Sequence, residues 1–144
     1  GLCGPLVNPY ARHLTVVDLS AGMLARAREK GCYDELVEAE LTSYLAGLDG
    51  AADLIVSADT LVYFGDLSAV LGAAGGRLVF SVERDERDEG FRLDFSGRYC
   101  HGEGYLRRVL EEAGLRVSAM VPVELRMEGG HPVAGYIVSA CVTG

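Results

Sequence analysis

The fold of this chain is decided at residues 13–20, which read HLTVVDLS. An apolar run ends there in a single carboxylate, Asp18, and Ser20 is a residue type that caps helices. Residues 21–24, AGML, then begin an amphipathic helix. A carboxylate at the carboxyl end of a parallel strand can accept hydrogen bonds from both hydroxyls of a ribose. The stretch therefore predicts a nucleotide-binding unit made of a strand, an acid and a helix.

Along the whole chain, short apolar strands alternate with amphipathic helices. Strands are expected at 14–17, 36–39, 53–57, 77–82, 117–125 and 133–142. Helices are expected at 2–10, 21–30, 42–48, 67–74 and 102–113. The last two strands flank the turn Glu128-Gly129-Gly130-His131 and should form an antiparallel hairpin. This order predicts an α/β fold, in which a doubly wound, mostly parallel sheet has helices on both faces and closes with that hairpin.

Irregular structure is expected between the strand at 77–82 and the helix at 102–113. Residues 83–90 carry five acids and two arginines, which predicts a mobile charged loop. Residues 95–101, FSGRYCH, read as a second loop. Its polar and aromatic side chains would either line a pocket for a substrate or anchor the loop. Strict alternation of apolar residues over 117–125 predicts a regular, half-buried strand.

Two features of the pattern indicate missing sequence. A doubly wound sheet needs a strand that pairs with both the 14–17 and the 53–57 strands, and its absence would leave two edges unpaired. We therefore expect one domain over residues 1–144, incomplete at its N-terminus. The crossover at 66–76 is also short, because about nine helical residues rise only roughly 13 Å. It is either a genuinely short helix or a segment that has lost residues near Ala74-Gly75.

Composition and charge bear on which partners the protein can bind and on where it is expected to be found. The formal net charge of −8 argues against binding of nucleic acid through its phosphates. No apolar run of about 18 residues predicts a membrane span, and no secretion signal opens the chain. The four cysteines lack close spacing, so we expect free thiols in a reducing cytosol and no metal site. The oligomeric state is left open.

Taken in order, the motifs resemble those of class I S-adenosylmethionine-dependent methyltransferases over nearly the whole chain. The second-strand motif is matched by VDLS at 17–20 with Met23-Leu24, and the third by VEAEL at 37–41. DLIVSAD at 53–59 with LVYF at 61–64 resembles the fourth, and GGRLVFS at 75–81 the fifth, without the family's proline. Residues 105–115 resemble the last helix. Gly1 resembles the last glycine of the loop that follows the first strand, a strand absent from this chain.

The resemblance implies a Rossmann-like methyltransferase fold, S-adenosylmethionine as cofactor, and methyl transfer to a small molecule or a protein side chain. The cofactor-binding residues it implies are Gly1, Asp18, Leu19, Met23, Glu40, Leu41, Ser57 and Ala58. Among them, Asp18 would accept from the ribose hydroxyls and Glu40 from the adenine amino group. The substrate side would contain Asp59, Tyr63, Tyr99 and His101. The family shares no universal catalytic residue, so none is assigned.

Each of these residues also has an ordinary structural interpretation. Asp18 would then be a solvated acid beside a helix N-terminus, and Met23 a core residue. Asp59 would cap a turn, and His101 would anchor its loop. Two other functions stay open: a nicotinamide-dependent oxidoreductase on a related sheet, and a non-catalytic module that kept the fold. The glycine loop upstream of Gly1 would discriminate between them.

Overall fold

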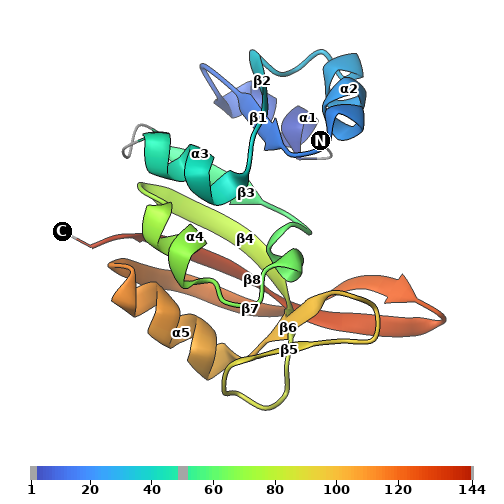
Figure 1. Cartoon of the computed structure of the whole chain (residues 1–144), viewed down its shortest axis with the longest axis vertical. Helices are drawn as coiled ribbons and strands as arrows, with labels where there is room; N and C mark the ends of the chain where they lie inside the picture. The colour runs from blue at the N-terminus through green and yellow to red at the C-terminus, as the bar shows by residue number, and fades with distance from the viewer. Residues whose placement is uncertain (1–2, 49–51, 144) are drawn as a thin grey trace. The chain divides into compact units, whose positions relative to one another are not determined.

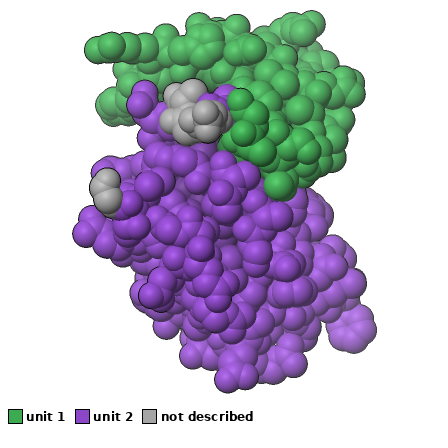
Figure 2. Space-filling view, turned by 60° about the vertical axis from the view of Figure 1, so that its left-hand side comes forward, with its two compact units in different colours: residues 1–47 green, residues 48–144 purple. Residues whose placement is uncertain are grey.

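The computed structural model describes residues 3–48 and 52–143 (Figure 1). The chain divides into two compact units, residues 1–47 and residues 48–144, which Figure 2 colours separately. Each unit is described by itself. Among the described residues, no helix is long and apolar enough to cross a membrane.

The first unit is a strand–helix–strand arrangement. Its elements in order are α1 (Gly4–Val7), η1 (Asn8–Tyr10), β1 (Thr15–Asp18), α2 (Ala21–Glu29), β2 (Glu35–Glu38) and α3 (Leu41–Leu48). β1 and β2 pair in parallel, with Asp18 opposite Glu38 at their carboxyl ends. The predicted cap is confirmed, because the Met23 backbone N–H donates to Ser20 Oγ at 3.2 Å. The chain leaves α2 through Gly31, whose φ of +67° favours glycine.

The second unit is built on a six-stranded sheet. Its strands are β3 (Leu54–Ser57), β4 (Arg77–Arg84), β5 (Phe91–Leu93), β6 (Tyr99–His101), β7 (Leu115–Glu128) and β8 (His131–Val142). Its helices are η2 (Leu61–Tyr63), α4 (Ser68–Ala73) and α5 (Glu103–Glu112). β3 and β6 pair with β4 in parallel, and β8 pairs with β4 antiparallel. The mixed α/β class is therefore confirmed, with parallel pairing in both units and antiparallel pairing at β5 and at the closing hairpin.

β4 contributes three buried apolar side chains to the core of the second unit. Leu78, Phe80 and Val82 are buried on one face of the sheet, together with Val138 and others from β8. α4 and α5 contact each other and lie on one side of this sheet (Figure 1). Fully burying one such side chain stabilises the fold by roughly 1.5–3 kcal/mol. The covered face of β4 therefore contributes to the stability of this unit, together with the buried residues of α4, α5 and β8.

The opposite face of the same sheet carries exposed apolar side chains. Leu54 and Val56 of β3 are exposed, as are Val121 and Ile137, which are paired across β7 and β8. Ser81 lies directly opposite Ile137 and so belongs to this face. Among the described residues, β1 and β3 each pair with one strand only.

The region predicted to be irregular contains two strands. β4 continues to Arg84, so Glu83 is a strand residue and not part of a loop. β6 pairs with β4 through Glu83 and Cys100, and β5 pairs with β6. Asp85, placed in a mobile loop by its charge, is buried and accepts from the Arg87 side chain. Strands of three residues carry no usable period, so only the tertiary pairing reveals them.

The crossover at 66–76 contains one short helix. α4 has six residues, and β3 still pairs in parallel with β4 from Leu54 opposite Arg77. Asp66 lies just before the N-cap residue Leu67, and its Oδ1 accepts from the Ser68 backbone N–H at 2.9 Å. The chain re-enters the sheet at Gly76, with φ +71° and an ideal Cβ only 2.5 Å from the Ala52 carbonyl oxygen. That close approach requires glycine.

The closing hairpin is confirmed, but its alternation is not strict. Gly129 and Gly130 have φ of +57° and +77° between the paired Glu128 and His131, as a two-residue hairpin turn requires. Register shifts interrupt β7 between Val117 and Ala119 and between Glu124 and Arg126. Each leaves one extra residue on β7, which is a β-bulge that redirects the following side chains.

Gly135→Ala should destabilise the second unit. An added Cβ would lie 2.5 Å from the Val82 carbonyl oxygen and 2.4 Å from Leu125 Cδ1, so backbone must move. We expect urea unfolding to show a loss of about 1–3 kcal/mol. Gly72→Ala is the matched control, because its Cβ meets nothing within 4 Å. It should be neutral or slightly stabilising, and an equal loss in both variants would contradict this account.

Candidate functional site

Asp18 lies where the sequence predicted, at the carboxyl end of β1 and before α2. Its Oδ1 accepts from the Ser20 backbone N–H at 2.9 Å, which fixes the side chain. Its Oδ2 has no hydrogen-bond partner within the described part of the chain. A carboxylate that is held by one oxygen and open at the other can accept from a ligand hydroxyl.

Leu19 and Met23 follow Asp18 and are both exposed. The core interpretation of Met23 is therefore wrong, since the buried residues of α2 are Leu24 and Ala27. Two exposed apolar side chains next to an anchored carboxylate offer a surface on which a flat, weakly polar ring could lie.

Glu40 performs a structural task in this structure. Its carboxylate accepts from the backbone N–H of Thr42 at 3.0 Å and of Ser43 at 2.8 Å, at the start of α3. These hydrogen bonds lower the pKa of Glu40 below its ordinary value. Each carboxylate oxygen keeps a further lone pair, so the cap leaves room for one more donor. Leu41 is the first residue of α3, directly after this cap.

Ser57 and Ala58 mark the carboxyl end of β3 in the second unit. Ser57 Oγ is buried and has no hydrogen-bond partner within residues 3–48 and 52–143. Buried hydroxyls without a partner are uncommon in folded proteins, because each costs part of its desolvation energy. Ala58 is exposed, and its carbonyl oxygen accepts from Thr60 Oγ1 at 3.2 Å.

Asp59 has a left-handed backbone conformation, which could not be predicted from the sequence. Its φ is +53°, and no other non-glycine residue in the described part of the chain has a positive φ. The Asp59 backbone N–H donates to Ser81 Oγ at 3.1 Å, and Arg126 Nη1 donates to Asp59 Oδ1 at 3.4 Å. Its side chain is nevertheless 66% exposed. Residues held in this region of φ cluster at binding and active sites.

The aromatic residues expected on the substrate side differ in exposure. Tyr63, in η2, is exposed. Tyr99, in β6, is half-buried and lies edge-to-face with Phe91, their ring centroids 5.9 Å apart.

His101 anchors its segment and does not face solvent. Its side chain is 0% exposed, and its Nε2 lies 2.9 Å from the Phe64 carbonyl oxygen and 3.0 Å from that of Gly65. Its ring stacks with Tyr105, their centroids 6.0 Å apart. Burial lowers the pKa of His101, which keeps the ring neutral. In this structure the His101 side chain has no exposed surface, and its contacts are those of a residue that anchors its segment.

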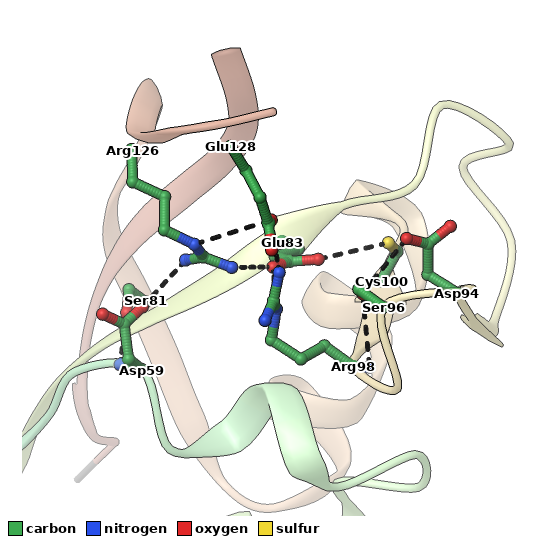
Figure 3. Close-up of polar contacts among 9 residues, drawn as sticks. All are labelled: Asp59, Ser81, Glu83, Asp94, Ser96, Arg98, Cys100, Arg126 and Glu128. Carbon is green, nitrogen blue, oxygen red and sulfur yellow. Dashed lines mark hydrogen bonds and ion pairs between the residues drawn. The ribbon is translucent and has the colours of Figure 1, made fainter. Parts of the chain in front are cut away.

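Sequence reasoning missed a buried carboxylate, Glu83, around which charged side chains gather (Figure 3). The Glu83 side chain is 5% exposed, and its Oε1 accepts from Arg98 Nε at 2.7 Å and from Arg126 Nη2. The Cys100 thiol donates to Glu83 Oε2 at 3.7 Å, and Arg98 also pairs with Glu128. These carboxylates raise the pKa of Arg98. The sequence signal nearest to this cluster was Arg98, within residues 95–101, which were expected either to line a pocket or to anchor the loop.

The described residues contain no group of three His, Cys, Asp or Glu that could hold a metal ion.

Comparison with known proteins identifies the family. A family profile described as "Methyltransferase domain" matches residues 2–77, more than half of the 144 residues. A search of curated proteins found no match to the chain.

Solved structures of methyltransferases are similar to the chain in fold. A methyltransferase from Methanosarcina mazei is 13% identical, with a TM-score of 0.70 over 98% of this chain and 90% of its own. Magnesium protoporphyrin IX methyltransferase from Synechocystis PCC 6803 with bound SAH is 19% identical, with a TM-score of 0.71 over 99% and 68%. A 1,6-didemethyltoxoflavin-N1-methyltransferase from Burkholderia thailandensis is 17% identical, with a TM-score of 0.66 over 90% and 61%.

The anchored acid after β1, the strand order of the second unit and the profile match agree with one another. They confirm the resemblance that the motifs carried. The chain belongs to the methyltransferase domain family, and its fold is that of S-adenosylmethionine-dependent methyltransferases.

Proposed function

We propose that this protein binds S-adenosylmethionine and transfers its methyl group to a small molecule or a protein side chain. The observation that carries the proposal is Asp18, anchored by Ser20 at the end of β1 with its second oxygen open. Membership of the methyltransferase family supports this function over the nicotinamide-dependent alternative. Because β1 and β3 each have one neighbouring strand among the described residues, we also propose that the single domain of residues 1–144 continues upstream.

In the first unit, the proposed contacts are to the nucleoside. Asp18 Oδ2 accepts from the ribose hydroxyls, and the exposed side chains of Leu19 and Met23 flank the adenine. Glu40 accepts from the adenine amino group through the lone pairs that its helix cap leaves free, beside the Leu41 backbone. Gly1, proposed to approach the methionine part, lies outside the described residues.

In the second unit, Ser57 and Ala58 complete the proposed cofactor set. Ser57 Oγ is buried without a partner among the described residues, so a polar group of a bound ligand would satisfy it. On the substrate side we retain Asp59, Tyr63 and Tyr99. Asp59 and Tyr63 are exposed, and Tyr99 is half-buried, so each has surface available for contact.

Methyl transfer from a sulfonium requires the protein to position the two reactants. It does not require a covalent bond between the protein and the methyl group. When bound, S-adenosylmethionine supplies a methyl group on a sulfonium, which leaves as a neutral thioether. The chain's residues must align the acceptor behind that methyl group and exclude water, and positioning alone can supply several kcal/mol. A general base is needed only if the acceptor must lose a proton before attack. We assign no catalytic residue.

The acceptor class follows from charge and from the neighbours. The formal net charge of −8 disfavours nucleic acid as a substrate. Two similar structures are methyltransferases named for protoporphyrin IX and for 1,6-didemethyltoxoflavin, which are small molecules. We propose the same broad class for this protein, with a protein side chain as the other option.

Asp18→Asn should weaken binding of S-adenosylhomocysteine. Hydrogen bonds to a charged group contribute roughly 1.5–3 kcal/mol each, so calorimetry should show a loss of about tenfold or more in affinity. Glu38→Gln is the matched control, since Glu38 ends β2 directly opposite Asp18. Equal affinity in the two variants would contradict the role given to Asp18.

Cofactor binding should raise the Tm of the full-length natural protein. S-adenosylhomocysteine at a hundred times its Kd should stabilise the folded state by about 2.7 kcal/mol. NADH at the same concentration should leave the Tm unchanged. No shift at millimolar S-adenosylhomocysteine would favour the non-catalytic module, and a shift with NADH alone would favour the oxidoreductase.

A further inference from the structure

The charged side chains around Glu83 form one connected set, which we call the Glu83 network: Asp59, Glu83, Arg98, Arg126 and Glu128 (Figure 3). Its centre is a nearly buried carboxylate that accepts from two guanidinium groups. A buried carboxylate is stable only when it is paired and hydrogen-bonded, so Glu83 fixes the positions of both arginines. The network joins segments that are far apart in the sequence, from residue 59 to residue 128.

Arg126 reaches this network because of a β-bulge. Glu83 and Val123 both lie opposite Gly135, so their side chains share one face of the sheet. Regular alternation from Val123 would place Leu125 on that face and turn Arg126 away. The extra residue between Glu124 and Arg126 reverses the alternation and directs Arg126 toward Glu83.

Arg126 in turn orients Asp59. Arg126 Nη1 donates to Asp59 Oδ1 at 3.4 Å, while Nη2 of the same planar group is held by Glu83. Asp59 Oδ2 has no partner in the described ranges 3–48 and 52–143, and the side chain is 66% exposed. The carboxylate is therefore tied at one oxygen and presented at the other, just beyond the carboxyl end of β3, where ligands bind in such sheets.

The exposed part of the network is acidic. Three carboxylates and two guanidinium groups give the network a net charge of −1. The Asp59 and Glu128 side chains are 66% and 48% exposed, whereas those of Arg98 and Arg126 are 17% and 28% exposed. Both arginines already donate to carboxylates. A ligand that approaches this surface meets open carboxylate oxygens, which favour a cation or a hydrogen-bond donor.

We propose that Arg126 is a positioning residue that holds Asp59 toward the acceptor, and that the acceptor is an amine. This inference rests on the proposed function. In the reaction, the amine nitrogen gives its lone pair to the methyl carbon as the carbon–sulfur bond breaks, the bond's electrons stay on sulfur, and the nitrogen's proton passes to solvent. Asp59 accepts an N–H of the amine and so aligns its lone pair.

Two cofactor analogues test this without a known acceptor. S-adenosylhomocysteine is a neutral thioether, whereas sinefungin carries an amine at the position of the transferred methyl group. Calorimetry on the full-length natural protein gives the ratio of their Kd values. If the Asp59 carboxylate faces the position of the transferred methyl group, the protein should bind sinefungin more tightly than S-adenosylhomocysteine. Loss of the Asp59 charge should reduce that ratio of Kd values about threefold or more.

The variants separate positioning from simple charge. Asp59→Asn should reduce the preference for sinefungin and leave the Kd of S-adenosylhomocysteine unchanged. Arg126→Gln removes a positive charge, so electrostatics alone would increase the preference, whereas loss of positioning decreases it. Arg126→Lys should restore part of the preference. Arg116→Gln, an exposed arginine on the same strand, is the control and should change neither Kd.

Each outcome decides the question. A reduced preference in both Asp59→Asn and Arg126→Gln supports the inference. Binding of both analogues with no preference in the natural protein overturns it, as does an increased preference in Arg126→Gln. Failure of the natural protein to bind either analogue overturns the proposed function as well. If Arg126→Gln does not fold, the exposed Asp59→Asn variant and the natural protein's own preference still decide.

Discussion

The alternation of side chains along β4 is the constraint on which the second unit depends. Phe80 and Val82 are buried on one face of the sheet, where they hold the unit together. Ser81 and Glu83 must then point to the other face, because successive strand residues alternate. Ser81 accepts from the Asp59 backbone N–H. Glu83 accepts from the side chains of Arg98 and Arg126. The same strand therefore provides both the core and the polar supports of the candidate substrate side.

The first unit applies a similar principle on a smaller scale. β1 ends in Asp18 shortly before α2 begins. The Ser20 side chain caps the helix, and the Ser20 backbone N–H fixes the Asp18 side chain. Methyl transfer requires a bound cofactor and an acceptor aligned with its methyl group, so positioning is the main task of the protein. This explains how a family can keep its fold while its acceptors vary.

Local signals made much of the fold predictable. The Ser20 cap, the apolar periodicity of α5 and the Gly129-Gly130 turn are each decided within a few residues, and the structure confirms them. The strands β5 and β6 and the bulge before Arg126 depend on pairing between distant segments. The sequence identified Asp18 and Asp59 as candidates and gave anchoring as one alternative for His101, but it did not show the buried Glu83, whose partners come from distant segments.

A crystal structure of the full-length natural protein with S-adenosylhomocysteine tests the central claim most directly. The account predicts that the Asp18 carboxylate lies within hydrogen-bond distance of the ribose hydroxyls, about 2.5–3.0 Å. It predicts that Ser20 still donates to the same side chain. A nucleoside bound elsewhere, with the Asp18 carboxylate facing only solvent, would contradict it.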